Sequence, residues 1–103
     1  MTLLQTYDFE YRVGYTDPKL KFPQLAQGGS YQFSLQGIEG SYLANVVWDY
    51  AYNDFCIEMY NDKGDLLQTR LRVAENINLF YVESGYHLEY SITEQAFLFW
   101  SLS

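Results

Sequence analysis

The sequence contains few of the side chains on which metal sites and nucleophilic catalysis depend. It holds one cysteine and one histidine. Cys56 alone cannot form a disulfide within the chain, and His87 has no second histidine or cysteine at metal-ligand spacing. We therefore expect no metal site and no cofactor. Cys56 is interpreted as a small buried hydrophobe, and His87 as a surface or packing side chain.

Known catalytic motifs are also missing. The sequence has neither a GxSxG nucleophile motif nor a glycine-rich phosphate-binding motif. A glycosidase needs only two carboxylates about 5–10 Å apart, so a pair such as Asp49 and Glu58 on adjacent strands stays open. Charged residues on neighbouring strands usually form the solvated face of a sheet, and a small barrel has few loops to enclose a cleft. We predict that the chain is not an enzyme.

Long apolar runs and an excess of positive charge are absent as well. No segment has the roughly 20 apolar residues that span a bilayer. The N-terminus, MTLLQTYDFEYR, lacks the basic start and apolar run of a secretory signal. Six basic residues against thirteen acidic ones give a net charge of −7, which repels nucleic acid and anionic lipid. We expect a soluble protein made in a reducing compartment, with no direct nucleic acid binding and no membrane insertion.

What the chain does have is strand-like alternation over the length of one domain. Its 103 residues are 49% hydrophobic, enough for a single core. Large side chains at every second position predict a half-buried strand from Tyr7 to Tyr15, and two prolines with two glycines then predict a loop over residues 16–29. Further alternating or apolar runs lie at residues 30–37, 41–52, 55–59, 66–73, 77–82, 86–92 and 95–102.

Polar turn signals separate these runs. GIEG at residues 37–40, Asn53 with Asp54, and NDKGD at residues 61–65 each predict a reversal. The last of these lacks the closing glutamate of a calcium loop, so it is interpreted as a turn with Gly64 at positive φ. Only residues 89–96 could hold a helical turn, with Ser91 or Thr93 as its cap.

These signals predict an all-β fold, a small single-domain barrel or sandwich of about seven short, mostly antiparallel strands. Residues 1–103 form one domain in this interpretation. Residues 1–28 are an N-terminal strand, or arm, with its loop, and residues 29–103 are the β core.

The eleven tyrosines exceed what a small core can bury, because each hydroxyl needs a partner or water. Tyrosine and tryptophan dominate the energetics of protein contacts, so an interface is one explanation. Stacking on sugars is a second, and ordinary cross-strand pairing on a half-buried sheet is a third. The residues predicted for an interface are Tyr7, Phe9, Tyr11, Tyr15, Trp48, Tyr50, Tyr52 and Tyr60.

The order of motifs in residues 30–80 resembles that of the phage and prophage baseplate plug proteins. QFSLQG is followed by a glycine-containing turn and by NVVWDYAYNDFCIEMYNDKGDLLQTRLRVAENINLF. The elements that match the family pattern are the strands at Gln32–Gly37, Trp48–Asn53 and Phe55–Tyr60, the acidic-glycine turn Asp62–Gly64, the pair Leu66 and Leu67, and finally Asn78 and Leu79. The first 28 residues and the region after Val82 depart from that pattern.

The resemblance implies a structural virion component of a bacteriophage tail. Such a protein is made in the host cytoplasm and located in the virion, as a baseplate or tail-tube-end part, a plug or hub-associated protein. Its partners would be tail-tube, hub and baseplate proteins, in a symmetric multi-copy assembly of three-fold or six-fold order. The alternative is a carbohydrate- or receptor-binding β module of a phage tail. Assembly would cover Trp48, Tyr50 and Tyr52 with other chains, whereas sugar binding needs coplanar aromatics open to solvent.

Overall fold

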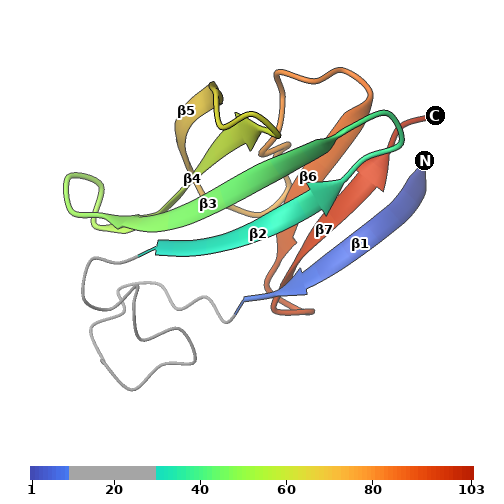
Figure 1. Cartoon of the computed structure of the whole chain (residues 1–103). Coiled ribbons are helices and arrows are strands. Elements are labelled where there is room, and N and C mark those ends of the chain that lie inside the picture. The colour runs from blue at the N-terminus through green and yellow to red at the C-terminus, as the bar shows by residue number, and fades with distance from the viewer. Residues whose placement is uncertain (10–29) are drawn as a thin grey trace.

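The computed structural model describes residues 1–9 and 30–103, and within them seven strands form two antiparallel sheets (Figure 1). One sheet has the order β1-β7-β6 and the other β2-β3-β4-β5. The strands are β1 (Thr2–Asp8), β2 (Ser30–Gln36), β3 (Ser41–Asp49), β4 (Asp54–Asn61), β5 (Leu66–Arg72), β6 (Tyr86–Ser91) and β7 (Ala96–Ser101). This confirms the predicted all-β fold, as a sandwich of two separate sheets. The described residues contain no helix, and so none that could cross a membrane.

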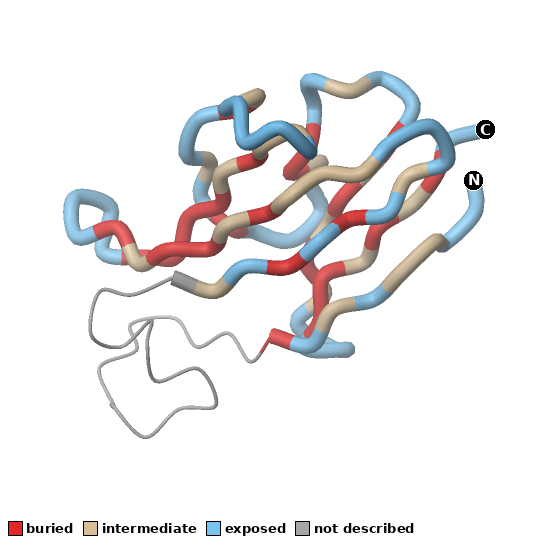
Figure 2. Tube along the Cα trace, in the orientation of Figure 1, coloured by how far each residue is buried: buried red, intermediate tan, exposed pale blue. Residues whose placement is uncertain are grey.

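The core between the two sheets is rich in aromatic side chains. Buried residues recur along the strands of both sheets (Figure 2). The core forms because alternate residues of a strand point to the same side of the sheet. In β6, Tyr86, Leu88 and Tyr90 are buried, and the residues between them are half-buried. The buried core comprises Phe9, Phe33, Leu35, Ala44, Val46, Phe55, Ile57, Met59, Val73, Leu79, Phe80, Tyr86, Leu88, Tyr90, Phe97 and Phe99.

The N-terminal strand is part of this sandwich. β1 pairs with β7 along its length, with a register shift between Leu3 and Gln5, and it begins ahead of the predicted start. Phe9 directly follows β1, and its side chain is fully buried in the core. Residues 10–29, with most of the predicted first strand and the whole of the predicted loop, lie outside the described residues. Residues 2–9, interpreted from the sequence as part of an arm, thus contribute a strand and a core side chain.

β1 and β2 lie side by side where the two sheets meet (Figure 1). Gln5 Oε1 accepts the backbone N–H of Gln36 at 2.7 Å, and the Tyr7 hydroxyl donates to the carbonyl oxygen of Ser34. Side chains of β1 therefore bind backbone groups on the outer edge of β2. This matters because an unpaired strand edge is a template for pairing with other chains.

The connection between β5 and β6 covers the opposite side of the sandwich. The Leu79 N–H donates to the Leu88 carbonyl of β6 at 2.6 Å. The buried side chain of Gln68 in β5 donates to the Leu79 carbonyl at 2.8 Å and accepts the Tyr81 N–H at 3.1 Å. The predicted apolar segment at 77–82 is thus irregular in backbone, but it buries Leu79 and Phe80 in the core.

The predicted NDKGD turn is confirmed. The Asn61 N–H donates to the Asp65 carbonyl at 2.9 Å, while Asn61 Oδ1 accepts the N–H groups of Lys63 and Asp65. Gly64 has a φ of 85°, a conformation that glycine adopts without steric cost. The sequence of this stretch is therefore explained by the turn it forms.

The helical turn predicted within residues 89–96 is wrong. β6 continues to Ser91 and β7 starts at Ala96, so residues 92–95 form a hairpin turn. Ser91 Oγ accepts the Glu94 N–H at 3.2 Å, as a helix cap would, and the Gln95 N–H donates to the Ile92 carbonyl at 3.2 Å. The same local hydrogen bond stabilises a tight turn here, because core burial of the flanking side chains keeps both neighbours extended.

Gly37 is needed for the close approach of Tyr86 to the β2–β3 turn. A Cβ at this position would lie 2.5 Å from the Tyr86 hydroxyl oxygen and 2.8 Å from the Gly40 carbonyl oxygen. We predict that Gly37→Ala lowers the unfolding free energy by about 1–3 kcal/mol, measured by urea denaturation. Gly85→Ala is the control, since its Cβ would meet nothing within 4 Å. Equal stability of the two variants would contradict the packing described.

Candidate functional site

The turn between β3 and β4, residues 50–53, forms an exposed hairpin tip. Asp49 Oδ1 accepts the N–H groups of Ala51 at 2.8 Å and Tyr52 at 3.2 Å, the pattern of an Asx turn. Asn53 takes the left-handed conformation, with a φ of 53°, which asparagine tolerates better than most residues. The result is that Tyr50 and Tyr52 are 71% and 54% exposed on a turn whose backbone is held from within.

The hairpin tip is also supported by its neighbours. The Arg72 guanidinium lies 5.8 Å from the centre of the Tyr52 ring, within cation–π range, and its Nη2 atom is 3.0 Å from Asp54 Oδ2. Behind the tip, the half-buried Trp48 ring meets the buried Phe55 ring edge-on, with 4.9 Å between ring centres. The exposed tyrosines therefore stand next to packed aromatic and charged groups of the sheet.

An arginine ties the outer face of the four-stranded sheet together. From β5, Arg70 Nη1 lies 2.8 Å from Asp49 Oδ2 of β3, and Arg70 Nε lies 3.3 Å from Glu58 Oε2 of β4. Glu58 Oε1 in turn accepts hydrogen bonds from Asn45 Nδ2 at 3.0 Å and the Tyr60 hydroxyl at 3.3 Å. We call these residues the outer-face network. The hairpin tip is anchored in it through Asp49.

The outer-face network affects the protonation of Asp49, one of the two carboxylates that contact Arg70. The hydrogen bond from Arg70 holds the pKa of Asp49 below its ordinary value, helped by the N–H groups of Tyr52 and Ala51. A general acid needs the opposite shift, a raised pKa. Asp49 and Glu58, left open as a carboxylate pair by the sequence, therefore share one arginine, and Asp49 also stabilises the turn.

Four of the residues predicted for an interface lie on the β3–β4 hairpin. Trp48, Tyr50 and Tyr52 lie at or beside its tip. Tyr60 lies at the other end of β4, where burial, followed by the neighbouring Glu58, raises the pKa of its hydroxyl. The structure thus brings the first three together and leaves Tyr60 apart.

The remaining predicted interface residues belong to the N-terminal region. Tyr7 is half-buried in β1, its ring centre 4.5 Å from that of Phe33, and burial raises the pKa of its hydroxyl. Phe9 is fully buried in the core of this chain. Tyr11 and Tyr15 lie outside the described residues.

The cysteine and the histidine occupy different environments. Cys56 is fully buried, as predicted, and burial raises the pKa of its thiol to about 11, which disfavours the reactive thiolate. His87 Nε2 lies 3.5 Å from Glu89 Oε2 on the partly exposed face of β6. Across residues 1–9 and 30–103, no three His, Cys, Asp or Glu side chains gather closely enough to hold a metal ion.

Arg70 and Arg72 make ionic contacts that the sequence alone does not predict. Their spacing in Thr69-Arg70-Leu71-Arg72 places both on the same face of a strand, which is the signal that was available. Which acidic residues they contact depends on the pairing of β4 with β5, whose register shifts on both sides of Met59. Such irregularities are not visible in the alternation of side chains.

Comparisons with known proteins identify no relative of this chain. No model of a protein family matches the chain, and no curated protein or solved structure matches it. The resemblance of residues 30–80 to baseplate plug proteins stays a prediction.

The lowered pKa of Asp49 makes a testable contribution to stability. A carboxyl whose pKa is lower folded than unfolded stabilises the fold above its unfolded pKa, here 3.8, and loses that effect as pH falls through the folded pKa. We predict that Asp49→Asn, which keeps the turn acceptor, lowers the urea midpoint at about pH 7 and lowers it less at about pH 2.

Asp62→Asn, in the exposed NDKGD turn, is the control for this measurement. It removes the same charge from a residue outside the outer-face network, so its midpoint should stay close to that of the unmodified chain at both pH values. An equal loss for Asp49→Asn at both pH values would show that packing, and not the ion pair with Arg70, is responsible.

Proposed function

We propose that the chain is a structural component of a bacteriophage tail, which joins other tail proteins through side-chain contacts centred on the hairpin tip. The observation that carries this proposal is the high exposure of Tyr50 and Tyr52, 71% and 54%, on a turn fixed by Asp49. The resemblance of residues 30–80 to baseplate plug proteins supplies the biological setting.

Energetics favour the hairpin tip as an anchor for a partner. Tyrosine buries a large area at a small cost in conformational entropy, and a turn already held in place reduces that cost further. With 71% and 54% of their surface exposed, Tyr50 and Tyr52 can bury about 190–310 Å² between them, and a stable interface takes about 800 Å² from each partner. The tip therefore supplies the centre of an interface, with neighbouring surface completing it.

At the sheet edges formed by β2 and β6, the structure favours side-chain contacts with a partner over strand addition. Side chains of β1 bind backbone groups of β2 through Gln5 and Tyr7, and the 74–85 connection binds β6. A partner that added a strand at these edges would have to displace those bonds. The net charge of −7 also favours partners with basic surfaces, because complementary charge speeds association.

The alternative, a carbohydrate- or receptor-binding module, also uses exposed tyrosines. A sugar stacks on the open face of an aromatic ring, and Arg72 lies over one face of the Tyr52 ring. A glycan would therefore have only the other face of Tyr52, beside Tyr50. A protein partner can bury the rings and the arginine together, which is why we place assembly first.

The decisive experiment measures mass in solution by light scattering, for the chain alone over a range of concentrations and then with the tail-tube and hub proteins encoded beside it. We expect a ring, or a complex with those neighbours. The double variant Tyr50→Ser/Tyr52→Ser should weaken the association by about tenfold or more, because two central aromatic anchors are lost. Circular dichroism should show an unchanged fold.

Tyr81→Ser is the matched control. Tyr81 is 60% exposed, but it lies in the connection before β6, away from the hairpin tip. Equal weakening by this variant would show that the tip has no special role. A strict monomer that ignores its neighbours, yet binds glycans through Tyr50 and Tyr52, would replace the assembly role by the carbohydrate-binding one.

A further inference from the structure

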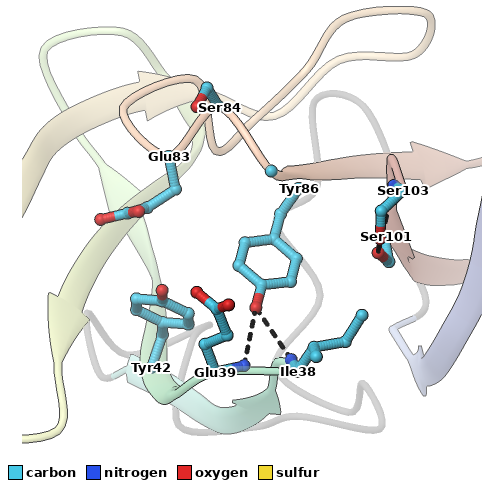
Figure 3. A pocket seen from close by; sticks show the side chains of 9 residues that line it. Ile38, Glu39, Tyr42, Glu83, Ser84, Tyr86, Ser101 and Ser103 are labelled. Atoms are coloured by element: carbon cyan, nitrogen blue, oxygen red, sulfur yellow. Dashed lines mark hydrogen bonds between the residues drawn. The ribbon is translucent and has the colours of Figure 1, made fainter.

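A second surface lies at the other end of β3, in a hollow of about 350 Å³ (Figure 3). It is bounded by the β2–β3 turn, the residues just before β6 and the end of the chain. Its walls carry Glu39, Tyr42, Glu83 and Tyr86, with serine hydroxyls around them. We call it the tyrosine–glutamate hollow. Its volume is at the small end of the range for ligand sites and suits a single side chain better than a large ligand.

The walls of the hollow are fixed by the fold. The Tyr86 side chain is only 7% exposed, and its hydroxyl oxygen accepts the N–H groups of Ile38 at 2.8 Å and Glu39 at 3.3 Å (Figure 3). Its ring packs against Phe99, with 5.2 Å between ring centres, and meets the Tyr42 ring at 68°. Tyr86 thus holds the turn that carries Glu39.

The hollow is electrostatically negative. Its two carboxylates come from separate segments, and within the part of the chain that the structure describes neither is paired with a Lys, Arg or His side chain. Burial raises the pKa of Tyr42, and Glu83, Tyr86 and Glu39 raise it further. Two carboxylates beside two tyrosine rings favour a cation, since ring faces also attract positive charge.

The Tyr86 hydroxyl offers a hydrogen-bond donor to an occupant of the hollow. Its oxygen already accepts two backbone N–H groups, and its own proton has no acceptor among residues 1–9 and 30–103. Tyr86 lines the hollow and is only 7% exposed. An occupant with a carbonyl oxygen would accept that proton. A cationic side chain next to a peptide carbonyl has both features.

We propose that the tyrosine–glutamate hollow binds a lysine or arginine residue of a partner protein. The cationic group lies by Glu39 and Glu83, and the carbonyl of that residue accepts the Tyr86 proton. This inference rests on the proposed function, because it takes the occupant to be part of another protein. The net charge of −7 attracts the same kind of partner.

The test uses capped single amino acids as probes of the full chain, followed by NMR of the backbone amides. N-acetyl-lysine and N-acetyl-arginine methylamides should shift the amides of Ile38, Glu39 and Ser84 at millimolar concentrations, and less so as salt is added. The uncharged norleucine analogue should not. The double variant Glu39→Gln/Glu83→Gln should weaken the response by about fivefold or more.

Glu94→Gln is the charge control. Glu94 is exposed in the β6–β7 turn, at the end of β6 opposite to Tyr86, so this variant should bind the probes as the unmodified chain does. No local shifts, equal shifts with norleucine, or shifts unaffected by Glu39→Gln/Glu83→Gln would overturn the proposal. If n-butylammonium binds as well as the lysine probe, the carbonyl is not recognised and the proposed polypeptide occupant is wrong.

The proposal for the tyrosine–glutamate hollow and the proposal for the hairpin tip can be rejected independently of each other. Tyr50→Ser/Tyr52→Ser should keep probe binding, because the hollow shares no residue with the tip. Probe binding without any association with tail proteins would reject the tail-assembly function and leave the cation site. Association with tail proteins that is unaffected by Glu39→Gln/Glu83→Gln would reject the hollow as a contact and leave the tail-assembly function.

Discussion

The position of Phe9 between the two sheets is the constraint on which the sandwich depends. Its ring lies 5.8 Å from Tyr31 and 5.2 Å from Phe55 of one sheet, and 5.5 Å from Phe97 and 6.1 Å from Tyr90 of the other. The Tyr90 hydroxyl also donates to the Phe9 carbonyl at 2.5 Å. Aromatic pairs of this kind add about 0.5–1.5 kcal/mol each to the burial of their area. One side chain next to β1 thus contacts both layers.

The sheets carry different chemistry on their outer faces and at their ends. The outer-face network around Arg70 neutralises part of the acidic charge and ties three strands together. The hairpin tip and the tyrosine–glutamate hollow lie at opposite ends of β3, which at about 3.4 Å per residue separates them by about 27 Å. One partner at each end would therefore not compete with the other for space.

Much of the fold could be predicted from the sequence, because alternation and turn chemistry are local properties. Asn61 and Gly64 predict their turn, and the large apolar residues at every second position of β4 predict its core-facing side. The start of β1 was missed because TLLQT does not alternate, and the register shift between Leu3 and Gln5 shows why. Ser91 followed by Glu94 is typical of a helix cap, but the same hydrogen bond, from the Glu94 N–H to Ser91 Oγ, also forms in a tight turn. The helix prediction was wrong for this reason.

The candidate surfaces were less predictable, because they depend on how distant segments meet. The alternation at Tyr7, Phe9 and Tyr50 is similar, yet Phe9 is in the core, whereas Tyr50 is exposed in the turn between β3 and β4. The contacts of Arg70 follow from irregular strand pairing, and the hollow joins segments far apart in the sequence. Neither the contacts of Arg70 nor the hollow corresponds to a local motif in the sequence.

The connection over residues 74–85 has a practical consequence for anyone who modifies this chain. By secondary structure it is a loop, and loops are the usual sites for inserted tags or protease sites. Here Leu79 and Phe80 fill the core, and Gln68 holds the backbone on either side of Phe80. An insertion belongs instead in the turn at Lys63, where the hydrogen bonds are local and the side chains face water.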